Sequence, residues 1–378
     1  MRWSYVAPGL LALLLAYIGI RLLPLLPAPA AVIGIVVLIA QFAVIVAVMS
    51  PGRRRRTHGA ALTWAGLTAL GLFSSLFVLT LLRDVAWVLL GLWSWALNDP
   101  TPWARFGRVT AWGVPLLAIA ASLLGFIGAR RVPQVREVEV PIGDLPRSLH
   151  GFSIVQISDL HVGPTIRGGF VRKVVERANS LQPDLTVVTG DMVDGSVPAL
   201  AEHTEPLGRL RSRHGVFAVT GNHEYYSGAH PWIAEFERLG LEVLMNEHRL
   251  LRHGDASLLL AGVPDFSAHH FDERHRSDPV RAAEGAPAEA RPRVLLAHQP
   301  RTALMAEAAG FDLQLSGHTH GGQFLPWKWF VPLQQPYTAG LHRLGGLWVY
   351  VSRGTGYWGP PKRLGAPSEI TLLRLVPG

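Results

Sequence analysis

The chain of 378 residues contains no cysteine. Disulfide bonds and thiolate metal ligands are therefore both excluded, so any metal ion must be held by histidine, carboxylate or amide side chains. Acidic residues are also scarce in the first third: residues 1–131 hold 11 of the 35 Lys+Arg but only 2 of the 27 Asp+Glu. Subtracting these leaves 24 basic and 25 acidic residues for the rest of the chain. This balance argues against nucleic acid as a partner.

Polar residues are nearly missing from three stretches, residues 6–26, 31–49 and 60–82, and from a fourth at residues 109–129. Each is close to the length of about 20 residues that a helix needs to cross a bilayer. None shows the polar face at a 3.6-residue period that a helix on a soluble core carries. Seven of the 12 Trp lie in this third of the chain, as in the aromatic belts of membrane interfaces. We predict a transmembrane region with four helices in residues 1–131, which a cleaved signal peptide would not explain.

The basic residues predict which side of the membrane each end of these helices faces. Four consecutive arginines, residues 53–56, follow the second helix, and Arg130 and Arg131 follow the fourth. Because positively charged loops stay in the cytoplasm, four helices place the N-terminus and the C-terminal domain there. Residues 85–97 are also apolar but too short for an ordinary span. We interpret them as an interfacial or re-entrant segment; if they crossed, the C-terminal domain would face outward.

From about residue 138 the sequence changes to short β-branched runs separated by Gly, Pro and Asp, with helical patterns between them. This alternation predicts a layered α/β domain at residues 151–378, preceded by a linker and first strand at residues 132–150. Strands are expected at residues 152–157, 185–189, 216–220, 258–263, 294–297, 313–315, 348–351 and 370–375. Helices are expected at residues 170–181, 200–211, 231–239 and 302–309.

Polar residues concentrate where these predicted strands end. Asp159 and His161 follow the strand at residues 152–157 and, being two apart in extended chain, can point to one ion. Four further strands are followed by Gly190-Asp191, Gly221-Asn222-His223-Glu224, His298 and Gly317-His318-Thr319-His320. The carboxyl ends of strands are where open α/β sheets bind ligands. Any one of these pieces arises by chance, but five at successive strand ends predict a metal site.

Carboxylate, imidazole and amide groups together suit divalent Mn, Fe or Zn. Two such ions about 3.5–4 Å apart can activate a shared water and neutralise phosphate oxygens. That arrangement needs a bridging carboxylate, for which Asp191 is the candidate. His223 follows Asn222 directly but points away from it, toward substrate, where an imidazole that titrates near neutral pH suits proton transfer.

The ordered set Asp-x-His, Gly-Asp, Gly-Asn-His-Glu, His and Gly-His-x-His resembles the calcineurin-like metallophosphoesterase superfamily, over about residues 152–375. Residues 316–323 are further similar to a branch with bacterial membrane-associated phosphodiesterases and animal transmembrane proteins with a metallophosphoesterase domain. The resemblance implies a two-sheet β-sandwich flanked by helices, with His223 protonating or stabilising the leaving oxygen. The ligand sets it implies are Asp159, His161 and His320 for one metal, Asn222, His298 and His318 for the other, and Asp191 for both.

Several other residues are candidates for a role near the site, most of them with more than one interpretation. Arg353 and Arg363 either contact phosphate through their guanidinium groups or lie on the surface. Glu224 contacts the substrate, orients a histidine ligand, or lies in a solvated loop. Asp194 is expected in a turn. Residues 327–330, Trp-Lys-Trp-Phe, either join a hydrophobic core or dip into the membrane interface and admit a lipid-linked substrate.

These observations predict a two-metal phosphoester hydrolase that cleaves a diester or pyrophosphate rather than a monoester. The membrane region favours a membrane-associated or lipid-linked substrate and contact with membrane lipids. Two other classes stay open. A non-catalytic membrane scaffold would lack ligands or His223, and all are present. A regulated transporter would carry charged residues inside its membrane helices, which the predicted spans almost lack.

Overall fold

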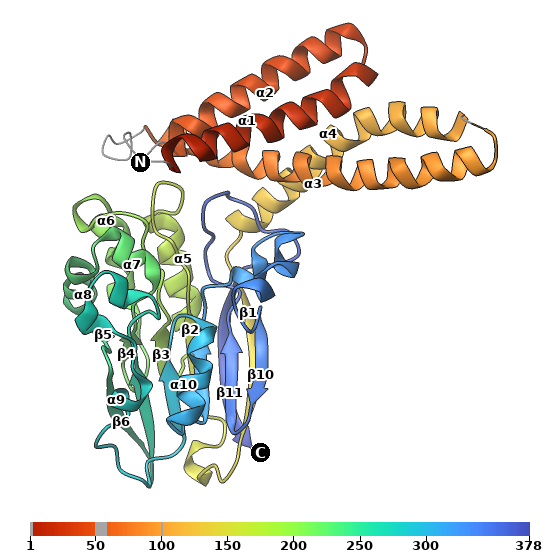
Figure 1. The fold of residues 1–378 in the computed structure, drawn as a ribbon. Helices are drawn as coiled ribbons and strands as arrows, with labels where there is room; N and C mark the ends of the chain where they lie inside the picture. Colours follow the sequence, from red (N-terminus) through yellow and green to blue (C-terminus); the bar gives the residue numbers. More distant parts are fainter. Residues whose placement is uncertain (1–2, 50–58, 100) are drawn as a thin grey trace. The chain divides into compact units, whose positions relative to one another are not determined.

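The computed structural model describes residues 3–49, 59–99 and 101–378 (Figure 1). The arginines at residues 53–56, on which the predicted topology partly rests, lie outside the described residues. The chain forms two compact units, a helical unit that ends at Ile127 and also includes residues 359–362, and a domain made of residues 128–358 and 363–378. Each unit is described by itself below.

The helical unit contains four helices that are long and apolar enough to cross a membrane. They are α1 (Trp3–Leu22), α2 (Ala28–Met49), α3 (Ala60–Ala96) and α4 (Thr101–Arg130). Leu15 of α1, Ile45 of α2, Leu76 of α3 and Val114 of α4 belong to one buried cluster that joins all four. Most of their remaining apolar side chains are exposed in the protein itself, as expected of helices that face lipid.

Helix α3 is longer than the third predicted span. It continues without a break through residues 85–96, so the short apolar stretch is part of α3 and forms no helix of its own. No Pro interrupts this region, and the helix ends before Asn98, which adopts a left-handed conformation with φ of 56°. The length of the continuous helix could not be predicted from hydropathy, because a charged pair lies inside it.

That charged pair, Arg83 and Asp84, is held by a polar cluster within the helical unit. Asp84 accepts hydrogen bonds from Tyr17 (2.7 Å), Arg21 (2.7 Å) and Arg83 (2.9 Å). The Arg83 guanidinium also lies 4.3 Å from the centre of the Trp87 ring. Charged side chains in apolar helices are costly unless paired, and this cluster pairs each of them.

The domain contains two six-stranded sheets. The first has the strand order β1 (Gln134–Ile142), β12 (Glu369–Pro377), β2 (Ser153–Ile157), β3 (Leu185–Val188), β4 (Val216–Ala218) and β5 (Glu242–Val243). The second has the order β10 (Gly340–Leu344), β11 (Leu347–Val351), β9 (Leu313–Ser316), β8 (Arg293–Leu296), β7 (Ala256–Gly262) and β6 (Glu247–His253). All eight predicted strands have a counterpart. The unpredicted β5, β6 and β10 are short or mixed-polarity edge strands, whose patterns are weak because only part of each is buried.

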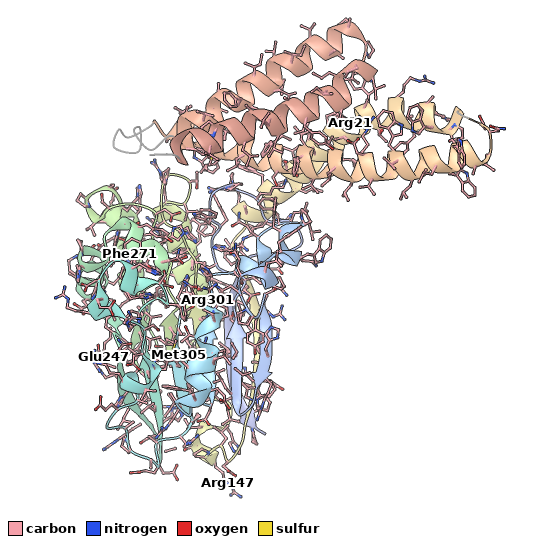
Figure 2. The ribbon with its side chains drawn as sticks, viewed as in Figure 1. Arg21, Arg147, Glu247, Phe271, Arg301 and Met305 are labelled. Carbon is pink, nitrogen blue, oxygen red and sulfur yellow. The ribbon has the colours of Figure 1, made fainter. Side chains whose placement is uncertain are left out.

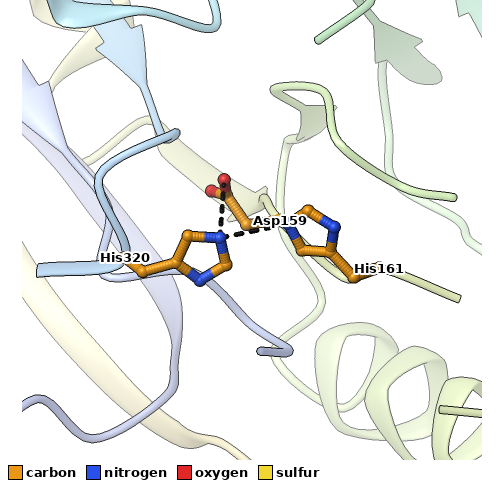
Figure 3. A group of neighbouring side chains, drawn as sticks. All are labelled: Asp159, His161 and His320. Carbon is orange, nitrogen blue, oxygen red and sulfur yellow. Dashed lines mark hydrogen bonds and ion pairs between the residues drawn. The ribbon is translucent and has the colours of Figure 1, made fainter. Parts of the chain in front are cut away.

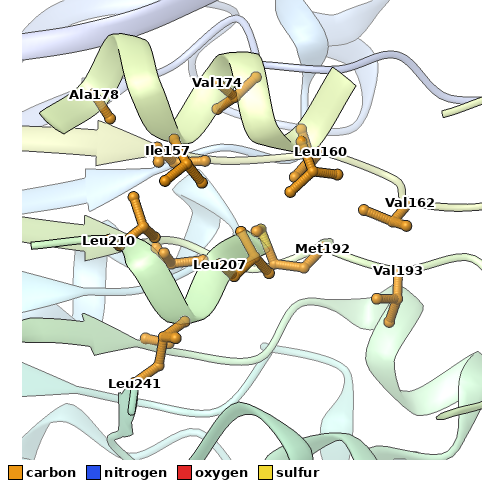
Figure 4. Packing of buried hydrophobic residues seen from close by; sticks show 14 of the residues in the cluster. Ile157, Leu160, Val162, Val174, Ala178, Met192, Val193, Leu207, Leu210 and Leu241 are labelled. Carbon is orange, nitrogen blue, oxygen red and sulfur yellow. The ribbon is translucent and has the colours of Figure 1, made fainter. Parts of the chain in front are cut away.

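Helices cover the outer faces of both sheets. They are α5 (Gly168–Asn179), α6 (Val197–Thr204), α8 (Ala229–Arg238), α9 (Pro279–Ala282) and α10 (Ala303–Ala308), while the short α7 (Asn222–Ser227) lies in the segment that follows β4. Successive residues of β3 serve different layers: Val187 belongs to the core between the sheets and Val188 to the core beneath the helices. Figure 4 shows that second core, where Val174 and Ala178 of α5 lie over Ile157 of β2. The predicted two-sheet β-sandwich flanked by helices is confirmed.

Parallel strands at the centre of each sheet position the loops that matter for function. β2, β3 and β4 run parallel in the first sheet, and β8 and β9 run parallel in the second. Their carboxyl ends therefore lie at common edges, where the loops that follow them can meet.

Candidate metal centre

The five loops that follow β2, β3, β4, β8 and β9 bring the predicted ligands together. Two groups have potential ligand atoms that all lie within 4.8 Å of one another. The first group is Asp159, His161 and His320, and the second is Asp191, His298 and His318. Six of the seven predicted ligands thus fall into two sets. The seventh, Asn222, is buried at the start of α7, next to Asp191.

The first group presents three donor atoms to one point (Figure 3). Nε2 of His161 lies 3.0 Å from Nε2 of His320, which is 3.5 Å from Oδ1 of Asp159. Nδ1 of His161 donates to Oδ1 of Asp194 over 3.1 Å, an assignment that leaves Nε2 free to bind a cation. Burial and the positive charge of Arg363, whose guanidinium is 3.0 Å from Nδ1 of His320, lower the pKa of His320. The imidazole is therefore neutral, as metal binding requires.

The second group is similar. Nε2 of His298 lies 3.1 Å from Oδ2 of Asp191 and 3.2 Å from Nδ1 of His318. Nδ1 of His298 donates to the carbonyl oxygen of Thr189 over 2.7 Å, which again directs Nε2 into the centre. Burial and the neighbouring His298 lower the pKa of His318 to about 3, so this ring is neutral as well.

Asp191 lies between the two groups. Its Oδ2 is 3.1 Å from Nε2 of His298 and 3.9 Å from Nε2 of His161. One carboxylate oxygen is therefore within reach of donors from both groups, which is the placement that a shared ligand needs.

The donor set fits divalent cations. Among the described residues, Oδ2 of Asp159 and Oδ1 of Asn222 are buried without a hydrogen-bond partner. Burying an oxygen in this way is costly unless something positive satisfies it. Nε2 of His161 and Nε2 of His320 also face each other, although only one of them can carry the proton of such a bond. Two cations, one in each ligand group, would resolve both features, and the oxygen and imidazole donors suit Mn, Fe or Zn.

The backbone of the ligand residues is strained. Asp159, His161, Asp191, His318 and His320 all have positive φ, between 52° and 69°. Residues other than glycine rarely adopt this left-handed region, and such residues cluster at functional sites. The turns after β2, β3 and β9 therefore adopt an unfavourable backbone conformation, and this conformation directs the ligand side chains.

Two glycines leave room for the carboxylates. A Cβ atom on Gly221 would lie 2.2 Å from Oδ1 of Asp191, and one on Gly317 would lie 2.2 Å from Oδ2 of Asp159. No larger residue fits at either position unless the carboxylate moves. The glycines of the Gly-Asn and Gly-His motifs are therefore explained by the close approach of backbone and ligand.

Asp194 links His223 to the centre, a role that the sequence did not reveal. Its Oδ1 accepts from Nδ1 of His223 over 2.5 Å as well as from His161. Burial alone would raise the pKa of Asp194, but the charges of and hydrogen bonds from both histidines hold it below its usual range. Burial opposes protonation of His223, yet the bond to Asp194 and the charge of Asp191 raise the pKa of His223 to about 9. The prediction that Asp194 is only a turn residue is incomplete.

Glu224 is fully buried and supports two ligand loops. Its carboxylate accepts hydrogen bonds from the backbone N–H groups of Asp191 (2.9 Å), Met192 (2.7 Å) and Gly221 (2.7 Å). Burial and the charge of Asp191 raise the pKa of Glu224 to about 7. This side chain fixes the backbone next to the ligands and has no surface left for a substrate.

The two arginines differ in exposure. Arg363 is buried and donates to the carbonyl oxygens of His320 (2.9 Å) and Arg353 (2.7 Å), so it braces the loop that carries His320. Arg353 keeps 29% of its side chain exposed and lies 3.7 Å from Glu369. Of the three residues predicted for the substrate side, only Arg353 has free surface.

Comparisons with known proteins agree with this geometry. The profile of the calcineurin-like phosphoesterase family matches residues 152–322. A transmembrane protein with metallophosphoesterase domain from Bos taurus is 41% identical over 277 residues, which cover 69% of this chain and 62% of that protein. The chain thus spans less than two thirds of the length of that relative. An uncharacterized metallophosphoesterase from Aquifex aeolicus is 32% identical over 245 residues, or 64% of this chain and 91% of that protein.

Among the solved structures to which the chain is similar is the sulfate thiohydrolase SoxB of Thermus thermophilus. It is 16% identical, with a TM-score of 0.37, and the match covers 61% of this chain and 57% of that one.

Proposed function

The chain belongs to the calcineurin-like phosphoesterase family, and we propose that it is a two-metal hydrolase that cleaves a phosphoester bond at the centre described above. The observation that carries this proposal is Oδ2 of Asp191, which lies within 3.9 Å of imidazole nitrogens from both ligand groups. The proposed ligands are Asp159, His161 and His320 for one cation, Asn222, His298 and His318 for the other, and Asp191 for both.

The protein side chains would divide the remaining work. Bound divalent cations supply charge neutralisation of phosphate oxygens and activation of water. Nδ1 of His223 donates to Asp194, and the pKa of about 9 keeps the ring protonated near neutral pH, so Nε2 also carries a proton that it can give to a leaving oxygen. Arg353, which is partly exposed, would contact a phosphate oxygen.

The proposed substrate is a phosphodiester or pyrophosphate that is membrane-associated or linked to a lipid. Support comes from the four apolar helices and from relatives that are named as transmembrane proteins. We further propose that the domain faces the cytoplasm, because four helices and the basic pair Arg130 and Arg131 favour that side.

Hydrolysis by the purified full chain tests the enzymatic proposal. The protein in detergent is analysed for bound metal and assayed with Mn²⁺ on a soluble aryl phosphodiester, beside Asp191→Asn, His223→Ala and the control His203→Ala on α6. We expect metal-dependent turnover by the wild type and the control, loss of metal and turnover in Asp191→Asn, and loss of turnover with metal retained in His223→Ala. If the wild type binds metal but shows no turnover, the result would support the non-catalytic scaffold instead.

A regulated transporter is the other alternative, and one observation favours it. The cluster of Tyr17, Arg21, Arg83 and Asp84 places ionisable groups within the helical unit, where the sequence had predicted almost none. Within the described residues these groups are paired with one another. Uptake of a phosphate-containing solute into liposomes that is lost in Asp84→Asn would support transport.

A further inference from the structure

Residues 325–333, which we call the hydrophobic loop, expose an unusual set of side chains. The loop follows the turn that carries His320. Its large apolar residues and their exposed fractions are Leu325 38%, Trp327 39%, Trp329 66%, Phe330 51% and Leu333 80%. Elsewhere in the described part of the domain, exposed large apolar residues occur singly or in pairs. Soluble proteins rarely expose a contiguous apolar patch without a partner for it.

The hydrophobic loop has a defined backbone. It consists of two 3₁₀ turns, η9 (Trp327–Trp329) and η10 (Val331–Leu333). A Cβ atom on Gly322 would lie 2.2 Å from Cα of Lys328, so the loop packs tightly against the end of the ligand turn. The rings of Trp327 and Phe330 have their centres 5.7 Å apart. Because the backbone of the hydrophobic loop is closely packed, its exposed apolar side chains project from a defined conformation.

Exposed aromatic residues also lie next to His223, the proposed proton donor. Gln323 holds Trp358 by two hydrogen bonds of 2.8 Å, one given and one accepted. Trp358 is 54% exposed, and its ring centre lies 5.8 Å from that of His223. On another side of His223, Tyr226 is 5.2 Å away and in turn contacts Phe271, which is labelled in Figure 2. Exposed aromatic rings therefore flank the proposed proton donor.

The end of a membrane helix belongs to this same domain. α4 ends at Arg130, which donates to the carbonyl oxygen of Thr165 over 2.9 Å and lies 3.4 Å from the hydroxyl of Tyr357. Tyr357 directly precedes Trp358. Only three residues separate α4 from β1. The last residue of α4 therefore lies beside Tyr357, the neighbour of Trp358 in the chain.

We propose that the hydrophobic loop inserts into the interface of the bilayer and that Trp358 guides the phosphate group of a lipid-linked substrate from there to His223. Trp, Phe and Lys side chains together are typical of segments at membrane interfaces, because the rings enter the apolar layer and the ammonium group stays with the headgroups. The proposal rests on the proposed function and specifies how its substrate reaches the centre.

Fluorescence quenching tests the insertion without any turnover. Because the chain has no cysteine, Trp329→Cys labelled with an environment-sensitive fluorophore reports from one position. The matched control is Leu304→Cys on α10, a site with 72% exposure. In nanodiscs of phosphatidylcholine and phosphatidylglycerol, we expect spin-labelled lipids to quench the label at position 329 and not the one at 304. Equal quenching at both positions, or none at 329, overturns the proposal.

Turnover of two esters with one leaving group tests the substrate path. The triple variant Trp327→Ser, Trp329→Ser, Phe330→Ser is assayed on soluble methyl para-nitrophenyl phosphate and on the para-nitrophenyl ester of phosphatidic acid in nanodiscs. We expect a loss of about tenfold, roughly 1.4 kcal/mol, on the lipid ester alone. An equal loss on both esters, or no loss on the lipid ester, contradicts the proposal. A wild type that cleaves neither ester contradicts the proposed function, and the quenching then decides the insertion by itself.

Discussion

The carboxylate of Asp194 accepts a hydrogen bond of 2.5 Å from Nδ1 of His223. The same oxygen accepts from His161 over 3.1 Å, so one side chain orients both a proposed ligand and the proposed proton donor. Partners of this kind fix which ring nitrogen stays free.

Replacing Asp194 by Asn should therefore lower both catalysis and metal affinity. We expect kcat to fall about 100-fold with KM nearly unchanged, and metal affinity to fall roughly 10–100-fold, the range seen for groups that orient metal ligands. Steady-state kinetics at saturating metal, with a metal titration, measure the two effects. Asp312→Asn, which removes a carboxylate paired with the exposed Arg291, is the control. An active Asp194→Asn enzyme would show that the turn alone orients His223.

Loss of Glu224 should destabilise the ligand loops. Glu224→Ala leaves four buried N–H groups without acceptors, at about 1–3 kcal/mol for each unsatisfied group. We expect the unfolding temperature of the domain to fall by about 6 °C or more, since 1 kcal/mol corresponds to roughly 2–4 °C in a domain of this size. Glu224→Gln keeps one acceptor oxygen and should lose less. Equal temperatures for the two variants would contradict this explanation.

Gly317→Ala should disable the first ligand group. Its Cβ atom would lie 1.9 Å from Oγ of Ser158 and 2.2 Å from Oδ2 of Asp159, so the carboxylate has to move. We expect the bound metal to fall from about two ions per chain toward one, with turnover reduced about 100-fold or more. Elemental analysis and the aryl phosphodiester assay measure this. Gly169→Ala on α5, where an added Cβ meets nothing within 4 Å, should leave both unchanged.

Removing metal should lower the stability of the domain. A ligand present at about 100 times its Kd stabilises the folded state by roughly 2.7 kcal/mol, so a chelator should lower the unfolding temperature by several degrees. Asp191→Asn, which removes the oxygen that both groups approach, should start lower and respond little to the chelator. The comparison is made by calorimetry in detergent. A wild-type transition that ignores the chelator would mean that the domain holds no tightly bound cation.

The sequence predicted which residues lie together at the candidate centre where the signal was local. Asp159 and His161 lie in one short turn after a buried strand, and such patterns follow from strand periodicity and chain order alone. The two sheets were predictable for a similar reason, because strands such as β3 are short runs of buried aliphatic and β-branched residues bounded by Pro, Gly and Asp.

Other features depend on partners that are distant in the chain. Asp194 resembles an ordinary turn residue until His223, 29 positions later, folds against it. Glu224 acts on backbone N–H groups, which leave no mark in a sequence. Helix α3 looked complete at residue 82 because Arg83 and Asp84 are polar, and their partner Arg21 lies more than 60 positions earlier. Such pairings require the fold.

The length of α3 has a consequence for the membrane around the protein. At 1.5 Å per residue its 37 residues extend about 55 Å, whereas the hydrocarbon layer of a bilayer is about 30 Å thick. Asp84 lies roughly 35 Å along this helix, so the following turns, with exposed Leu92 and Trp95, outrun the hydrocarbon layer. If α3 and α4 cross a bilayer, they tilt, thicken the surrounding lipid or project beyond it, and we expect the protein to be sensitive to acyl-chain length.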